Sequence, residues 1–151
     1  MKEKFFRLLR EQIRQGASPK KIALTIAFGL SLGVFPILGS TTLLCLLFAW
    51  ALKLNQPTIH FVNYLLYPVQ ILLIPVFIKA GSWFFDGKAA PFSVSKAADV
   101  FTKSPGLFLH KFGLLALYGM AAWTIVAVPF IAGTYYLVLP RLSGLKGERP
   151  S

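Results

Sequence analysis

An uncharged apolar run between Lys21 and Lys53 dominates the N-terminal part of the chain. It reads KIALTIAFGLSLGVFPILGSTTLLCLLFAWALK, and no acidic, basic or histidine residue lies between the two lysines. As one helix the run would measure about 46 Å, which exceeds the ~30 Å hydrocarbon core of a bilayer. It is also too short for two full spans of about 20 residues each. The pattern therefore predicts two half-length helices, over residues 22–52, that meet inside a membrane.

The centre of this run carries residues that stop and restart a helix. Pro36 removes a backbone donor and disfavours helical backbone at the preceding residue. Gly33 and Gly39 permit backbone conformations that other residues resist. Non-helical backbone at membrane depth is tolerated only against protein or a water-filled cavity. We therefore predict a re-entrant hairpin or a sharply broken span, with its break at Gly33, Pro36 and Gly39.

Two further patterns in this run have predicted roles. Thr25, Gly29 and Gly33 recur every four residues, and such a small-residue stripe lets another helix approach closely in lipid.

A half-helix that begins at depth leaves its first amides unpaired at the positive end of the helix dipole, where a carboxylate or phosphate can bind. The candidate ligand-binding residues at that helix start are Ser40, Thr41 and Thr42. The alternative is that these hydroxyls only cap the helix.

A second apolar stretch, residues 57–85, is interrupted by Pro68 and Pro75. We predict a kinked membrane segment here. Asn63 and Gln70 share one helix face if Pro68 only kinks the helix. Polar side chains in a lipid-buried helix face the protein interior. These two side chains are therefore expected either to join neighbouring helices or to complete the ligand site.

The remaining segments extend the pattern of an all-α integral membrane protein. The first sixteen residues are basic and carry apolar residues at Phe5, Leu9 and Ile13, which predicts an amphipathic helix in the headgroup plane or, alternatively, on a soluble partner. Residues 17–140 are expected to form a single membrane domain. Its later segments are a polar interfacial segment at 86–111 and a charge-free transmembrane helix at 112–140, and a disordered basic tail follows at 141–151.

Composition and charge agree with a multi-pass protein of the cell (inner or plasma) membrane. Hydrophobic residues make up 56% of the chain and charged residues 14%, and the formal net charge is +11. The basic residues flank apolar segments, as expected for contact with anionic lipid heads, and do not form a face for nucleic acid. We predict a re-entrant first hairpin, a crossing through 58–85 and a return through 112–139. A second re-entrant segment is the alternative. It would keep residues 86–111 inside and place the tail outside.

The motifs of enzymes and metal proteins are missing from the sequence. The apolar segments contain no acidic pair, and His60 and His110 lie far apart without cysteine or acidic neighbours. No Ser/His/Asp set and no phosphate-binding glycine loop is arranged for catalysis. Cys45 is the single cysteine, which excludes an internal disulfide. We expect no enzyme activity, no catalytic residues, no metal and no cofactor.

One stretch, roughly residues 15–85, carries a set of characteristic residues: Ser18-Pro19, Ala23, Gly29, Gly33, Pro36, Gly39, Thr42 and Leu52-x-Leu54-Asn55. In these residues the chain resembles a family of small bacterial membrane proteins, the domain of unknown function 2062. Many members have Asn-Pro-x-Thr where this chain has Asn63-Tyr64 and a displaced Tyr67-Pro68-Val69-Gln70, as in a divergent branch. The family name carries no activity with it. Some relatives are joined to glycosyltransferase-type domains, which implies a link to envelope or lipid-linked sugar metabolism.

Two classes of function remain from the sequence. The first is a transporter- or flippase-like protein for an amphipathic or anionic lipid-like substrate, because many transporters form substrate sites from broken helices. The second is a non-catalytic membrane scaffold for an envelope or lipid-linked-sugar biosynthetic enzyme, which suits a small chain with packing stripes and no intramembrane charge. In either case the expected partners are the bilayer and a second copy or another membrane protein.

Overall fold

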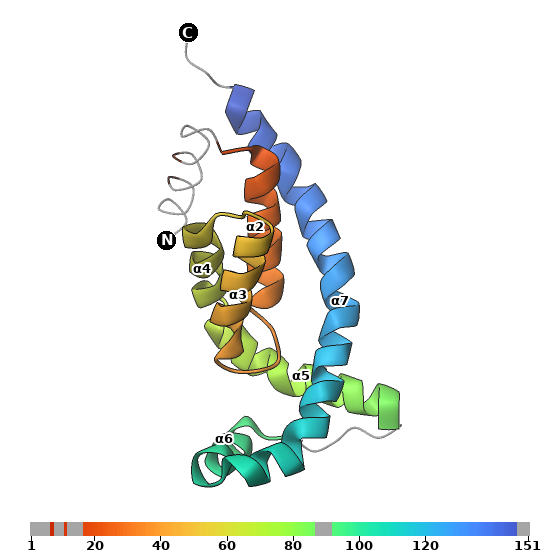
Figure 1. Cartoon of the computed structure of the whole chain (residues 1–151). Helices are drawn as coiled ribbons and strands as arrows, with labels where there is room; N and C mark the ends of the chain where they lie inside the picture. Colours follow the sequence, from red (N-terminus) through yellow and green to blue (C-terminus); the bar gives the residue numbers. More distant parts are fainter. Residues whose placement is uncertain (1–6, 8–10, 12–16, 87–91, 148–151) are drawn as a thin grey trace.

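The computed structural model describes residues 7, 11, 17–86 and 92–147. In this part of the chain every regular element is a helix, which confirms the prediction of an all-α fold there (Figure 1). The helices are α2 (Pro19–Leu32), α3 (Ser40–Ala51), α4 (Gln56–Leu65), α5 (Tyr67–Asp86), α6 (Val94–Lys103) and α7 (Pro105–Gly147). The amphipathic helix predicted for residues 1–16 lies outside the described residues, except for residues 7 and 11.

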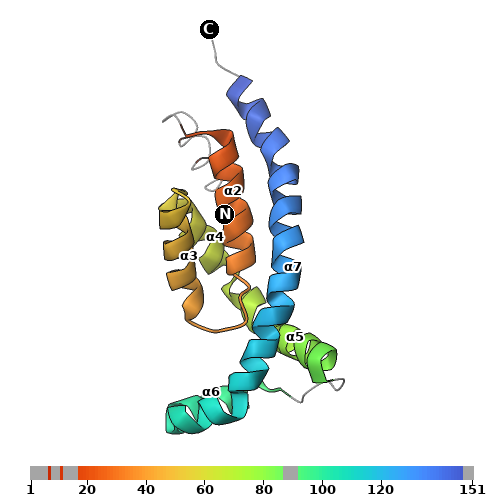
Figure 2. The same ribbon diagram turned by 45° about the vertical axis from the view of Figure 1, so that its right-hand side comes forward.

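Three short helices, α2, α3 and α4, lie side by side and alternate in direction next to α7 (Figures 1 and 2). Helix α2 contacts both of the others and α7. The Lys21 Nζ atom donates a hydrogen bond to the Lys53 carbonyl at 3.3 Å, so both ends of the α2–α3 hairpin lie at one end of the bundle. The two helices thus form a helical hairpin. Re-entry of this hairpin into a membrane stays a prediction.

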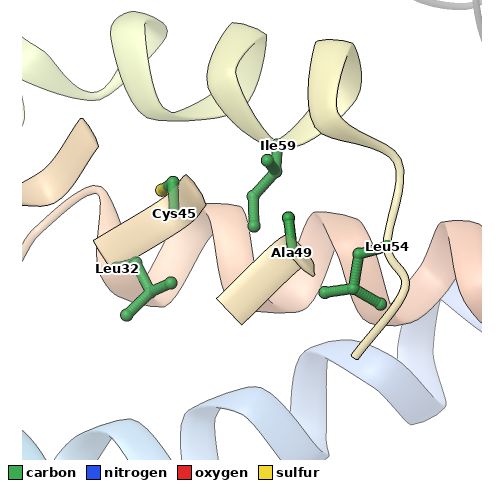
Figure 3. Packing of buried hydrophobic residues seen from close by; sticks show 5 residues of the cluster. All are labelled: Leu32, Cys45, Ala49, Leu54 and Ile59. Atoms are coloured by element: carbon green, nitrogen blue, oxygen red, sulfur yellow. The ribbon is translucent and has the colours of Figure 1, made fainter. Parts of the chain in front are cut away.

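The core of the short bundle is a small set of apolar side chains from all three helices. Leu32 of α2, Cys45 and Ala49 of α3, Leu54 of the following turn and Ile59 of α4 are at most 7% exposed and pack together (Figure 3). Cys45 is a free, buried thiol in this cluster. Small side chains at two of the α3 positions let α3 lie close to α4 and α2.

The second apolar stretch forms two helices that meet at Leu66. Pro68 has no backbone N–H and cannot bond a carbonyl of the preceding turn, which explains an interruption at this point. Helix α4 runs along the short bundle, whereas α5 crosses α7 below it in both views (Figures 1 and 2). The change of direction separates this stretch into two packing units. Pro75 lies inside α5 without ending it.

Helix α7 is longer at both ends than the helix predicted for residues 112–140. It begins at Pro105 and extends to Gly147, into the segment predicted as a disordered tail from residue 141. The extension has a packing reason, because Leu142 is buried against Ile22, Ala23 and Ile26 of α2. Burial of an apolar side chain stabilises the helix that carries it. Residues 148–151 lie outside the described part of the chain.

Candidate functional site

The break between α2 and α3 is an irregular turn over residues 33–39. The Gly33 N–H still bonds the Gly29 carbonyl at 3.0 Å, and the chain then leaves the helix through Pro36, which is buried. Gly39 directly precedes α3 and has a φ of 82°, a left-handed backbone conformation that favours glycine. The three residues predicted to make the break therefore all lie in this turn.

Gln70 of α5 donates hydrogen bonds to this turn. Its side chain is 0% exposed, and its Nε2 atom donates to the carbonyls of Phe35 at 2.9 Å and Ile37 at 3.3 Å. The Ser40 hydroxyl donates to the same Ile37 carbonyl at 2.9 Å. Two of the predicted site residues thus meet at one backbone oxygen. The Gln70 Oε1 atom has no hydrogen-bond partner among the described residues.

Trp123 of α7 contacts the other side of the break. Its indole N–H donates to the Ser31 carbonyl at 3.1 Å. Its ring meets Phe35 edge-on, with centroids 4.9 Å apart and an interplanar angle of 83°. Ser31 itself is 1% exposed, and its hydroxyl has no partner in the described part of the molecule. The end of α2 is therefore fixed to α7 through one aromatic side chain.

A cavity of about 370 Å³ lies beside this contact, between α2, α5 and α7. Its lining is almost entirely apolar and includes Val34 of the break, Leu66, Leu73 of α5 and Val126 of α7. Ser31 and Trp123 are the two lining residues with polar side-chain atoms. The arrangement can hold a hydrocarbon group and offers few hydrogen bonds to a polar one.

The other predicted ligand residues do not converge in the same way. Thr41 is 3% exposed and Thr42 is exposed, both in the first turn of α3, whose N-terminus has no side-chain cap. Asn63 is 3% exposed on α4, and its Oδ1 atom has no partner among the described residues. The interruption at Leu66 separates the helix of Asn63 from that of Gln70. A ligand role for these residues stays a prediction.

The small-residue stripe on α2 faces α4. A Cβ atom built on Gly29 would lie 3.0 Å from the Val62 Cβ atom, and one built on Gly33 would lie 2.9 Å from Leu66 Cδ1. The Thr25 hydroxyl accepts a hydrogen bond from the Asn55 N–H at 3.3 Å at the other end of the stripe. Glycine at these positions lets the two helices approach closely.

Sequence reasoning missed the close crossing of α5 and α7. A Cβ atom on Gly81 would lie 2.1 Å from the Tyr118 carbonyl oxygen, and one on Gly119 would lie 3.0 Å from Ile78 Cγ1. Sequence reasoning also missed Trp123. The sequence contained a signal for each feature. A glycine inside an apolar helix permits another helix to approach closely, and a tryptophan there needs a hydrogen-bond acceptor for its indole N–H.

The described helices include two candidate membrane spans and no candidate metal site. No group of three histidine, cysteine, aspartate or glutamate side chains is placed there to hold a metal ion. Two helical segments are long and apolar enough to cross a membrane, Tyr67–Phe85 and Pro105–Gly144. The fold and its helix break thus define an all-helical protein with two candidate spans.

The chain belongs to a bacterial family described as "Uncharacterized protein conserved in bacteria (DUF2062)", whose sequence profile matches residues 3–149. The match confirms the family resemblance and covers more of the chain than the stretch on which that resemblance was based. No curated protein and no solved structure matches the chain.

Proposed function

We propose that this protein is a small multi-pass protein of the bacterial inner membrane that moves an amphipathic lipid-like substrate, in the manner of a transporter or flippase. The observation that carries the proposal is the apolar cavity beside a broken helix pair. Many transporters place their substrate sites where discontinuous helices meet. Here Val34 of the break lines the cavity, and the buried Gln70 amide bonds the Phe35 carbonyl of the same break.

The exposure of the long helices supports a membrane location. Only 11% of the most apolar segment of α7 is buried, and only 28% of that of α5. A core helix of a soluble protein would be mostly covered, whereas a helix hydrophobic on its exposed faces suits a lipid environment. We therefore place the exposed faces of α5 and α7 in contact with lipid chains.

The lengths of the short helices support re-entry. Helices α2, α3 and α4 have 14, 12 and 10 residues, which corresponds to about 21, 18 and 15 Å. Each is shorter than the ~30 Å hydrocarbon core. In the break between α2 and α3, the Phe35 carbonyl accepts a hydrogen bond from Gln70 and the Ile37 carbonyl accepts one from Ser40. Irregular backbone in lipid needs such internal hydrogen bonds.

A lipid-scrambling assay on the purified full chain in liposomes tests this proposal. We expect fluorescent phospholipid of the inner leaflet to become accessible to a membrane-impermeant reductant faster than in protein-free liposomes. The double variant Thr41→Val with Thr42→Val should fold normally and slow the movement of an anionic phospholipid, because it removes two hydroxyls at the start of α3. Thr124→Val, at an exposed position on α7, is the matched control. Scrambling no faster than in protein-free liposomes would contradict the proposal.

A scaffold for an envelope or lipid-linked-sugar enzyme is the second candidate. It is favoured by the outer faces of α3 and α7, where large apolar side chains are exposed, among them Trp50 at 79% and Leu137 at 65%. Such faces suit another membrane helix as well as lipid. Absence of lipid movement in the scrambling assay, together with co-purification of a biosynthetic enzyme, would favour this second function.

A further inference from the structure

We infer that the cavity between α2, α5 and α7 binds one acyl chain of a bilayer phospholipid and leaves the headgroup outside. The inference rests on the membrane location in the proposed function and names the part of the substrate that this site would hold. It is independent of whether the lipid is moved.

The lining chemistry selects a hydrocarbon group. The cavity of about 370 Å³ is at the lower end of the ~300–1,000 Å³ range of ligand pockets. No charged side chain lines it, and the Trp123 N–H is already used by the Ser31 carbonyl. A phosphate or sugar placed there would lose its water without gaining enough hydrogen bonds, which is costly. A headgroup is therefore excluded from this cavity, and a chain of methylene groups fits it.

The mouth of the cavity indicates where the chain enters. Val69 of α5 and Val126 and Phe130 of α7 line the cavity and are also 40%, 51% and 45% exposed. These side chains belong to the two helices that are long enough to span a membrane. In a bilayer the surroundings of such a mouth are phospholipid tails, so the occupant comes from the bilayer itself.

The inner wall of the cavity lies at the helix break. Trp123 and Val34 line it, and Trp123 contacts Phe35 of the break. A chain in the cavity would therefore lie against the turn that Gln70 holds. Occupancy of this site can be read from Trp123 directly, because the indole forms part of its wall.

Fluorescence quenching by brominated phospholipid tests the inference. The chain has three tryptophans, and the background variant Trp50→Phe with Trp83→Phe leaves Trp123 as the sole emitter. In vesicles of phosphatidylcholine brominated on one acyl chain, we expect strong quenching of Trp123. Equal quenching is expected with a brominated anionic phospholipid, because the cavity does not contact the headgroup. Absence of quenching, or quenching that follows headgroup charge, would overturn the inference.

Two valines on α7 provide a matched pair of variants. Val126 lines the cavity and Val128 does not, although both are more than half exposed. Val126→Phe should lower the quenched fraction about two-fold, because the added ring occupies space that the chain would fill. Val128→Phe should leave it unchanged, and Val126→Leu provides a milder test if the larger ring disturbs folding. Equal effects at both positions would mean that Trp123 senses only the surrounding bilayer. Loss of scrambling with quenching intact would reject the transport proposal and leave the chain site standing.

Discussion

Gln70 is a fully buried side chain whose two hydrogen bonds both go to the backbone of another segment. Its amide nitrogen serves the Phe35 and Ile37 carbonyls in the turn between α2 and α3. Such a turn cannot bond its own carbonyls in a helical pattern, so an outside donor is needed. One side chain of α5 therefore contributes to the stability of the break, together with the Ser40 hydroxyl, which donates to the same Ile37 carbonyl.

Replacing Gln70 with methionine is expected to destabilise the protein by about 1–3 kcal/mol, because the Phe35 carbonyl loses its donor and the Ile37 carbonyl keeps only the Ser40 hydroxyl, while the side-chain volume is nearly kept. Gln56 provides a control, since its Nε2 atom also donates to a carbonyl, that of Leu46 at 3.3 Å, but this hydrogen bond is exposed although the residue is partly buried. Gln56→Met should have a smaller effect because water can replace the donor. Thermal unfolding of both variants in detergent measures the difference, and equal losses would show that the Gln70 bonds contribute little.

At the scale of helices, glycines determine which pairs pack closely. The contact of α2 with α4 passes through Gly29 and Gly33, and the crossing of α5 over α7 passes through Gly81 and Gly119. Dispersion contacts grow as backbones approach, and a side chain on these glycines would prevent the approach. The crossing at Gly81 brings α5 across α7 at the end of the molecule where α6 also lies (Figures 1 and 2).

The substitution Gly81→Ala is expected to lower stability, because its Cβ atom would lie 2.1 Å from the Tyr118 carbonyl oxygen and α5 would have to move. Gly133→Ala on α7 should act in the opposite direction. No atom lies within 4 Å of a Cβ atom there, and alanine is favoured over glycine in a helix by roughly 0.5–1 kcal/mol. Thermal midpoints in detergent compare the two variants. A rise in both would show that α5 and α7 do not cross closely in the folded protein.

At the scale of the whole molecule, two groups of segments lie at opposite ends of the structure. The start of α2, the turn after α3 and the end of α7 lie together at one end (Figure 1). The break, α5 and α6 lie toward the other. In a membrane, this arrangement would put residues 18, 56 and 143 on one side and α6 on the other.

Single cysteines in a Cys45→Ala background test this topology. Cysteines at Ser18, Gln56 and Ser143 are expected to react with an impermeant reagent from the same side of the membrane, and a cysteine at Ser95 of α6 from the opposite side. Labelling is measured in intact cells and in inverted membrane vesicles. Reaction of residues 18 and 56 from opposite sides would show that α2 and α3 cross the membrane instead of returning.

The break and the start of α4 could be predicted from the sequence because their causes are local. Pro36, Gly33 and Gly39 act on the backbone of their own segment. Pro57, where the second apolar stretch was predicted to begin, lies in the first turn of α4. The structure adds Asn55 as the cap of this helix, since its side chain accepts from the Thr58 N–H at 3.0 Å. Such effects depend on neighbours within a few residues and are visible in the order of amino acids.

The sequence alone determined an all-α chain with a broken first apolar run and membership of its bacterial family. Only the tertiary structure decided that α5 turns away at Leu66 and crosses α7, that Gln70 reaches the break, and that Trp123 closes one wall of the cavity. The hydrogen bonds among these features join residues that are 33 to 92 positions apart in the sequence. No local pattern encodes them, because they arise from close packing of side chains that meet only when the helices have assembled.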